Sequence, residues 1–189
     1  MSLQLSMNFK KHIWSCPAEY KDLSGAREIA IDLETRDEGI SSGQGAGWAT
    51  GNGNIIGFAV AVEGWQGYYP FKHFGGGNMI PDQVKKYIKD VCALPCPKIF
   101  HNAQYDVGWL EQEGFKVYGD IIDTMIAAAI VDENRFSYSL NTLSKDYLGE
   151  IKAETDLIIA AKEHGVDPKA EMWKLPAEYV GFYAEQDAR

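Results

Sequence analysis

Two acidic residues lie two positions apart in an apolar segment. Asp32 and Glu34 alternate with Ile31 and Leu33. Because side chains alternate between the two faces of a strand, both acids are expected on one face. Adjacent carboxylates repel and burial raises the cost of ionising them, whereas a hard divalent cation with oxygen ligands relieves both problems. The pair is compatible with a metal site and also with a solvent-facing edge strand.

A third acid follows a predicted junction between a strand and a helix. The segment from His101 to Leu110 contains Asn102 and Asp106. Polar groups that follow the carboxyl ends of strands commonly line the sites of α/β proteins. The alternative is structural: Asn102 caps the helix and Asp106 is an exposed acid in its second turn.

The last predicted helix carries a tyrosine and an acid one turn apart. Tyr183 and Asp187 have the i, i+4 spacing that places both on one helix face. The alternative is that Tyr183 packs in the core and Asp187 faces solvent. The neighbours Glu185, Gln186 and Arg189 are the more obvious solvent residues, so Asp187 is free to face the protein.

The elements that would position these residues follow from hydrophobic periodicity. Strands are expected at residues 27–34, 54–62, 68–71, 98–101 and 121–122. Helices are expected from Pro81, at 102–113, at 123–131 with Asp123 as cap, at 139–148, over most of 150–175 with a break at 165–168, and from Pro176 onward. Antiparallel strands followed by alternating helices and strands predict an α/β fold with one mixed sheet flanked by helices.

Two segments fall outside this pattern. Residues 36–54 are rich in glycine among Ser, Thr and Asn, and we expect a long mobile loop there that is placed to fold over a substrate. Residues 1–26 are expected to be an irregular lead-in, with a possible cloning scar at 1–3. The domain is expected at 27–189, and the nearness of Asp187 to the last residue suggests that the final helix was cut from a longer chain.

Composition excludes several classes of protein. The 189 residues, with 46% hydrophobic and 24% charged, suit one globular domain rather than a disordered chain. No apolar run reaches the roughly 18 residues of a membrane span, and the start is not a secretory signal. Lys and Arg number 18 against 27 Asp and Glu, a net charge of −9, so the domain is a poor nucleic-acid binder by itself. Cys16, Cys92 and Cys96 are expected to be reduced thiols, without a zinc-binding set.

Taken together, the three acidic motifs resemble the DEDD superfamily of 3′–5′ exonucleases. Asp32-x-Glu34, Asn102-x3-Asp106 and Tyr183-x3-Asp187 match its motifs in order, over roughly residues 27–189. The tyrosine identifies the tyrosine branch, since Phe182 stands where the histidine branch would need His.

Further segments are similar to the proofreading domain of bacterial or phage family A DNA polymerases. They are 69–73, 123–124, 135–140 and 147–149. The chain departs from the bacterial enzymes at 35–54, where its glycine-rich segment is longer, and residues 150–175 align poorly.

The resemblance implies an RNase H-like fold with a five-stranded mixed sheet. It also implies that Asp32, Glu34, Asp106 and Asp187 hold two divalent ions, Mg2+ or Mn2+, while Tyr183 orients a water molecule. Nucleoside 5′-monophosphates would be released from single-stranded or frayed DNA 3′ ends. Asn102 and Arg135 match family positions that face phosphates or sugars. Thr35, directly after Glu34, could meet the terminal 3′-hydroxyl through its amide or its hydroxyl. Tyr105 is a further candidate contact, for which packing in the core is the alternative.

The resemblance also implies a setting for the domain. A polymerase domain in the same polypeptide would supply the basic track for DNA, in the cytoplasm of a bacterial or phage-infected cell. Two other functions stay open from the sequence. One is an RNA 3′-processing exonuclease of the same superfamily. The other is a non-catalytic module that binds nucleic acid or a partner, which the loss of a metal carboxylate would mark.

Overall fold

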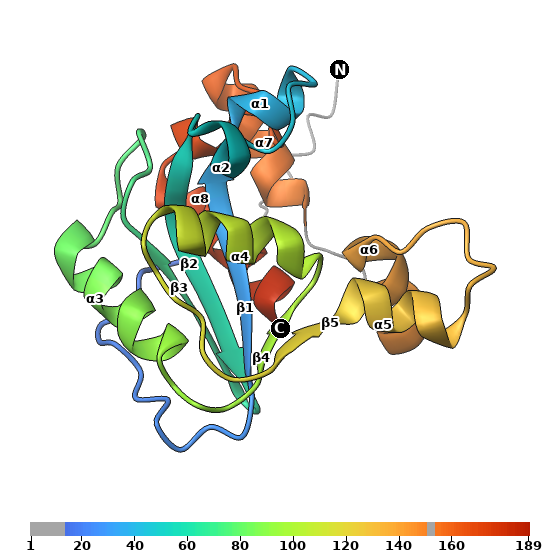
Figure 1. The fold of residues 1–189 in the computed structure, drawn as a ribbon. Helices are drawn as coiled ribbons and strands as arrows, with labels where there is room; N and C mark the ends of the chain where they lie inside the picture. Colours follow the sequence, from blue (N-terminus) through green and yellow to red (C-terminus); the bar gives the residue numbers. More distant parts are fainter. Residues whose placement is uncertain (1–13, 151–153) are drawn as a thin grey trace, which may run out of the picture.

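A single mixed sheet organises the protein (Figure 1). The computed structural model describes residues 14–150 and 154–189, and its five strands lie in the order β3-β2-β1-β4-β5. The strands are β1 (Ile29–Arg36), β2 (Asn54–Val62), β3 (Trp65–Pro70), β4 (Lys98–Phe100) and β5 (Ile121–Asp123). β1, β2 and β3 pair antiparallel, whereas β4 and β5 continue the sheet in parallel. The predicted five-stranded mixed sheet is therefore confirmed.

Helices flank the sheet on both faces. They are α1 (Glu38–Ser41), α2 (Gly47–Thr50), α3 (Pro81–Cys92), α4 (Ala103–Gln112), α5 (Thr124–Val131), α6 (Leu140–Leu143), the π-helical turn η1 (Ser144–Leu148), α7 (Thr155–His164), the 3-10 turn η2 (Met172–Lys174) and α8 (Ala177–Ala188). In Figure 1, α5 and α6 project from the far side of β5, away from the main body. No helix in the described ranges is both long enough and apolar enough to cross a membrane.

The two faces of the sheet belong to separate apolar clusters. One contains Ile31 and Leu33 of β1 together with side chains of α3 and α4. The other contains small residues of β2, including Ala59 and Ala61, beneath α7 and α8. This division follows from the period-two alternation of β1 and β2, which sends large apolar side chains to one face and small ones to the other. α8 therefore lies across β1, β2 and β3 on the face that also bears Asp32 and Glu34.

The close packing of α8 on the sheet also depends on small residues in the helix itself. Gly181 is buried, and a Cβ built on it would lie 2.1 Å from the ring of Trp14. Trp14 Nε1 donates to Glu185 Oε1 at 2.9 Å, and the same oxygen accepts from the Tyr68 amide at 3.2 Å. The segment before β1, which has no helix or strand over residues 14–28, thus holds α8 against the edge of the sheet.

A buried histidine ties β3 to the segment before α8. His73 Nδ1 lies 3.0 Å from the Leu175 carbonyl, which can only accept, so the Nδ1 proton is donated to it. Its Nε2 then accepts from the Tyr68 hydroxyl at 2.6 Å. Burial lowers the pKa of His73 to about 4, so the ring is neutral at pH 7.

The structure corrects the predicted mobile loop over residues 36–54. This stretch contains the two short helices α1 and α2, and the buried Asp37 holds them together. The Asp37 carboxylate accepts hydrogen bonds from the amides of Gly39, Ile40 and Gly47.

Other boundaries also differ from the predictions. β3 begins at Trp65, directly after a tight turn in which Gly64 has φ +75°, so Trp65 and Gln66 are strand residues rather than turn. The helix predicted over 139–148 divides into α6 and η1. The suspected scar at 1–3 lies outside the described residues. Cys16, Cys92 and Cys96 are all free thiols, as predicted.

Candidate nuclease site

Strand β1 carries the first two acids at the centre of the sheet. Asp32 is opposite Ala59 of β2 and Glu34 is opposite Gly57, with an irregularity in the pairing between Glu34 and Thr35. Glu34 is only 8% exposed and Asp32 is partly buried. β1 is thus an interior strand whose acids lie under α8, which excludes a solvent-facing edge.

Helix α4 brings the third acid to the same strand. The pairing of β4 with β1 ends at Ala30, and beyond it the Asp106 carboxylate occupies the open side of β1. Asp106 Oδ1 accepts from the amide of Leu33, the residue between Asp32 and Glu34, at 3.1 Å. Asp106 is 4% exposed, and this burial raises the pKa of its carboxyl to about 8. It is therefore a buried acid at the sheet, not an exposed acid of a surface helix.

Helix α8 brings Tyr183 and Asp187 to the other side of β1. Burial is the main cause that raises the pKa of the Tyr183 hydroxyl, and the charges of Asp187, Glu34 and Asp32 raise it further. The same charges on β1 raise the pKa of the buried Tyr68. Tyr183 therefore lies near enough to Asp187 of its own helix, and to Glu34 and Asp32 of β1, for their charges to act on its hydroxyl.

These acids form a donor set that suits a hard cation. Carboxylate oxygens are the ligands that Mg2+ and Mn2+ prefer, and a cation would offset the repulsion and desolvation that burial imposes. As they stand, no three His, Cys, Asp or Glu side chains within 14–150 and 154–189 form a group that could hold a metal ion. By ligand type the residues fit divalent ions, and enclosing one requires the side chains to close together.

A cleft of about 370 Å³ opens beside Glu34, and Asp32, Asp106 and Asp187 are not among the residues that line it. It is lined by Leu33, Glu34, Thr35, Tyr105, Ser139, Leu140, Asn141, Glu154, Lys169, Met172 and Tyr183. Two of the predicted substrate contacts, Thr35 and Tyr105, are therefore at the cleft. Sequence reasoning missed Asn141 and Lys169, which come from segments with no motif of their own.

Sequence reasoning also missed Asp37, which lies behind the cleft. Tyr105 OH donates to Asp37 Oδ2 at 3.0 Å and lies 2.8 Å from Thr35 Oγ1. Burial is the first cause that raises the pKa of Tyr105, so its hydroxyl stays protonated at neutral pH. The signal available in the sequence was Asp37-x-Gly39, since an Asp two residues before Gly favours a turn in which the carboxylate accepts backbone amides.

The other two predicted substrate contacts lie elsewhere. Asn102 is exposed with φ 68°, and its side chain does not cap α4. Asp123, the cap of α5 as predicted, also accepts from the amides of Asn102 and Ala103 and so fixes the backbone at the start of α4.

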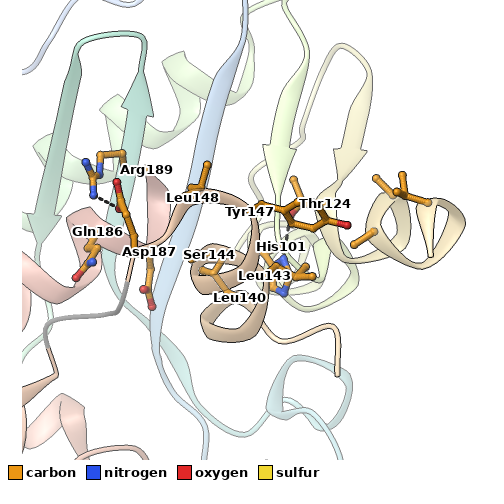
Figure 2. Close-up of a pocket in the computed structure, with 14 residues that line it drawn as sticks. His101, Thr124, Leu140, Leu143, Ser144, Tyr147, Leu148, Gln186, Asp187 and Arg189 are labelled. Carbon is orange, nitrogen blue, oxygen red and sulfur yellow. Dashed lines mark hydrogen bonds and ion pairs between the residues drawn. The ribbon is translucent and has the colours of Figure 1, made fainter. Parts of the chain in front are cut away.

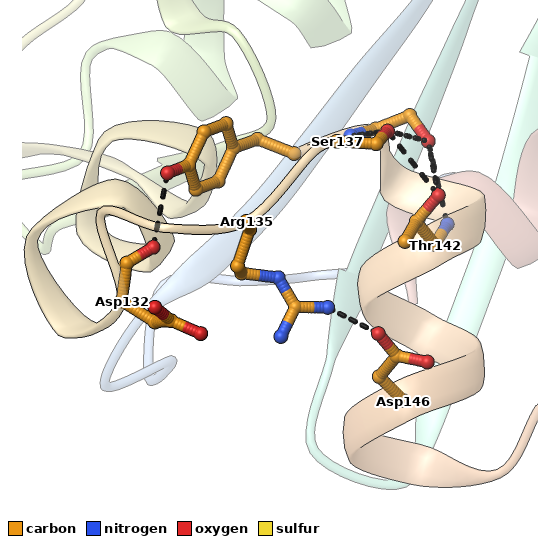
Figure 3. Close-up of polar contacts among 7 residues, drawn as sticks. Asp132, Arg135, Ser137, Thr142 and Asp146 are labelled. Atoms are coloured by element: carbon orange, nitrogen blue, oxygen red, sulfur yellow. Dashed lines mark hydrogen bonds and ion pairs between the residues drawn. The ribbon is translucent and has the colours of Figure 1, made fainter.

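Arg135 forms an ion pair with Asp146 of η1 (Figure 3). Its guanidinium also lies over the Tyr147 ring, 5.3 Å from the centroid. Neither Arg135 nor Asn102 lines the cleft beside Glu34.

A second pocket, of about 490 Å³, lies at the end of α8 (Figure 2). Apolar side chains of α5, α6 and η1 form most of its wall, and Asp187 of α8 and the following Arg189 also line it. His101 also lines it, and its Nδ1 is 2.9 Å from Thr124 Oγ1. Asp187 thus lines this apolar pocket and not the cleft beside Glu34, whereas Tyr183, one turn earlier on α8, lines the cleft.

A family model and curated relatives match most of this chain. The family model of the 3′–5′ exonuclease of DNA polymerase A matches residues 18–189. A DNA-directed DNA polymerase of Pseudomonas phage M6 is 37% identical over 170 residues, which is 87% of this chain and 26% of that protein. DNA polymerase DpoZ of Salmonella phage PMBT28 is 28% identical over 179 residues, 90% of this chain and 26% of that protein. The chain thus spans about a quarter of the length of these relatives.

Solved structures share the fold at low sequence identity. RNase D of Trypanosoma brucei has a TM-score of 0.59 and 24% identity, covering 88% of this chain and 55% of that one. RNase D of Escherichia coli has a TM-score of 0.57 and 15% identity, covering 88% and 37% of the two chains. At these identities the likeness establishes the RNase H-like fold alone.

Proposed function

Because the chain belongs to the 3′–5′ exonuclease family of DNA polymerase A, we propose that it removes nucleotides from DNA 3′ ends as nucleoside 5′-monophosphates. The hydrogen bond from the Leu33 amide to Asp106 is the observation that carries the proposal. It joins an acid of α4 to the strand residue between Asp32 and Glu34. Tyr183, whose pKa the same two acids raise, approaches from α8.

The four acids would hold two divalent ions, Mg2+ or Mn2+. Asp32 and Glu34 would bind from β1, Asp106 from α4 and Asp187 from α8. Two such ions, when bound, neutralise charge on the attacking and leaving oxygens of a phosphodiester. The roughly opposed approach of α4 and α8 toward β1 supports a site that closes around its ions.

Tyr183 would position the attacking water rather than deprotonate it. A general base must lose its proton near the working pH, whereas burial and three nearby acids raise the pKa of this hydroxyl from its ordinary value near 10. A protonated hydroxyl remains a hydrogen-bond donor and acceptor. That suits orientation of a water molecule in the cleft.

The substrate would be a single-stranded or frayed DNA 3′ end. A cleft of about 370 Å³ beside Glu34 accommodates an unpaired terminal nucleotide rather than a duplex. Lys169, Asn141 and the Thr35–Tyr105 pair are among the polar groups that line it and are available to the substrate.

The protein would act with a polymerase portion, as a proofreading module within a bacterial or phage-infected cell. The charge of −9 disfavours independent capture of DNA. The relatives are DNA polymerases about three and a half times as long as this chain, which supports a basic DNA-binding surface elsewhere in the same polypeptide.

Nucleotide release from end-labelled oligonucleotides tests the proposal. Single-stranded DNA, matched duplex, mismatched duplex and RNA of one sequence are digested with Mg2+ or Mn2+, and the products are separated. We expect 5′-monophosphates, with single-stranded DNA cleaved well ahead of matched duplex and mismatched ends between them. Asp106→Asn should abolish cleavage, whereas Asp82→Asn, an exposed acid of α3, should not. Faster digestion of RNA would favour an RNA-processing exonuclease, and inactivity on every substrate would favour a binding module.

A further inference from the structure

Three polar side chains connect the folded segment 37–53 to the wall of the cleft. Asp37 accepts from the Tyr105 hydroxyl at 3.0 Å, and Tyr105 shares a hydrogen bond of 2.8 Å with Thr35 Oγ1. Thr35 and Tyr105 both line the cleft next to Glu34. The order Asp37, Tyr105, Thr35 therefore leads from the buried interior of this segment to the space for substrate.

Asp37 is the fixed end of this series. Its Oδ1 accepts from the amides of Gly39, Ile40 and Gly47, each at 3.1 Å, while Oδ2 receives Gly47 at 3.0 Å and Tyr105. A carboxylate that caps α1 and joins it to the start of α2 in this way has one conformation. α2 in turn packs on α4, since a Cβ on Gly108 would lie 2.5 Å from the Trp48 ring.

The fixed carboxylate sets the direction of both hydrogen bonds. An ionised carboxylate only accepts, so the single proton of the Tyr105 hydroxyl points to Asp37. The Tyr105 oxygen must then accept from Thr35, which directs the Thr35 proton away from the cleft. Thr35 Oγ1 consequently offers lone pairs, and no proton, to whatever occupies the cleft.

We infer that Asp37 is a positioning residue that makes Thr35 a hydrogen-bond acceptor for the terminal sugar of the substrate, so that ends bearing a 3′ donor are preferred. This inference rests on the proposed exonuclease function. The 3′-hydroxyl of the last nucleotide is the donor that a DNA end brings into such a cleft. An end without a donor would leave Thr35 Oγ1 facing it without a partner.

Four single-stranded oligonucleotides test the inference. They are identical except at the last sugar, which carries 3′-hydroxyl, 3′-amino, 3′-fluoro or 3′-hydrogen. The first two donate a hydrogen bond and the last two do not. The wild-type protein should cleave the donor ends with a kcat/KM about tenfold above that of the non-donor ends, the factor expected for one hydrogen bond with a buried partner.

Asp37→Asn should remove or reverse this preference. The Asn oxygen must stay on the three amides, because an NH2 group cannot accept them, so the NH2 group faces Tyr105 and donates to it. Tyr105 then donates to Thr35, and the Thr35 proton turns toward the cleft. Tyr105→Phe should also abolish the preference, while leaving the Asp37 hydrogen bonds to the backbone intact. Glu38→Gln, an acid-to-amide change at the exposed neighbour of Asp37, should retain the wild-type ratio.

The ratio between ends separates positioning from a structural role. Loss of folding or of general activity lowers cleavage of all four oligonucleotides equally, and an unchanged ratio in both Asp37→Asn and Tyr105→Phe would overturn the inference. Binding titrations of the same oligonucleotides in EDTA give the ratio without catalysis. A wild-type protein that binds donor ends better and cleaves none would sink the proposed function while supporting the role of Asp37.

Discussion

At the scale of single residues, Asp106 connects stability to pH. Its folded-state pKa of about 8 lies above the ordinary value of 3.8, so the folded protein binds the proton more tightly. Stability contributed by the protonated form is complete below about pH 4 and is lost as pH rises toward 8. Asp106→Asn keeps an oxygen for the Leu33 amide and has no charge to bury. We therefore expect it to raise the metal-free Tm at pH 8 by about 5 °C or more, roughly 2 kcal/mol.

Thermal unfolding at several pH values and metal concentrations checks this expectation. The Tm difference between variant and wild type should grow from pH 4 to pH 8. Millimolar Mn2+ should raise the Tm of the wild type more than that of Asp106→Asn, because a ligand that binds only the folded state stabilises it. A Tm difference that is constant with pH, or a wild-type Tm indifferent to Mn2+, would contradict the acidic site.

Tyr183 gives a second prediction at this scale. Tyr183→Phe removes one hydroxyl while the ring still packs against the small residues under α8. We expect kcat to fall about 10- to 1000-fold with little change in KM, since an oriented water matters mainly in the transition state. The stabilisation by Mn2+ should remain, because all four carboxylates are present. If Tyr183→Phe keeps near-full activity in steady-state assays, this tyrosine has only a packing role.

At the scale of elements, the packing of α8 against Trp14 predicts that mutations of Gly181 and Trp14 have non-additive effects on stability. Gly181→Ala adds a methyl group where the Trp14 ring lies, so the unfolding free energy should fall by about 1–3 kcal/mol. In a Trp14→Ala background the same change should raise it by about 0.5–1 kcal/mol, because Ala is a better helix former than Gly. Chemical denaturation of the four proteins of this cycle measures both values, and additive effects would show that Trp14 does not hold α8.

The elements predicted correctly are those whose signals are local. The alternation around Asp32, the helical spacing after Pro81 and the cap at Asp123 each depend on residues within a single element. The segment 36–54 failed because its order comes from one carboxylate, Asp37, and from packing on α4, which composition does not reveal. Asn102 does not cap α4 with its side chain: its backbone is left-handed (φ 68°), and its own amide and that of Ala103 donate to Asp123, 21 residues away.

The three acidic motifs were predicted from their spacing, whereas Asn141 and Lys169 at the cleft were not. Arg135 matched a family position in the sequence, yet in the structure it pairs with Asp146 on the far side of β5. Asn141 and Lys169 reach the cleft only because of how α6 and the segment before η2 are placed. Long-range placement of this kind leaves no trace in local periodicity.

At the scale of the whole molecule, the net charge of −9 predicts that DNA is bound weakly and that its affinity falls with salt. With about two phosphate contacts, single-strand binding should fall about sevenfold between about 50 and 200 mM salt. Lys169→Gln should reduce the slope of log Kd against log salt by about 0.7, whereas Lys86→Gln on α3 should leave it unchanged. Fluorescence titrations with labelled oligonucleotides measure the slopes. A slope for Lys169→Gln identical to that of the wild type would show that Lys169 does not contact the DNA.

The thin layer of small side chains beneath α8 has a consequence for how the nuclease can be tuned. Asp32 and Glu34 belong to the sheet, whereas Tyr183 and Asp187 belong to the helix, and Ala59, Ala61 and Ala184 fill the space between the two elements. The gap across which the acids face one another is therefore set by methyl groups that take no part in chemistry. Exchanging Ala184 for a bulkier residue would move Tyr183 and Asp187 away from β1 together, so that all four acids would still be present but too far apart to share a cation.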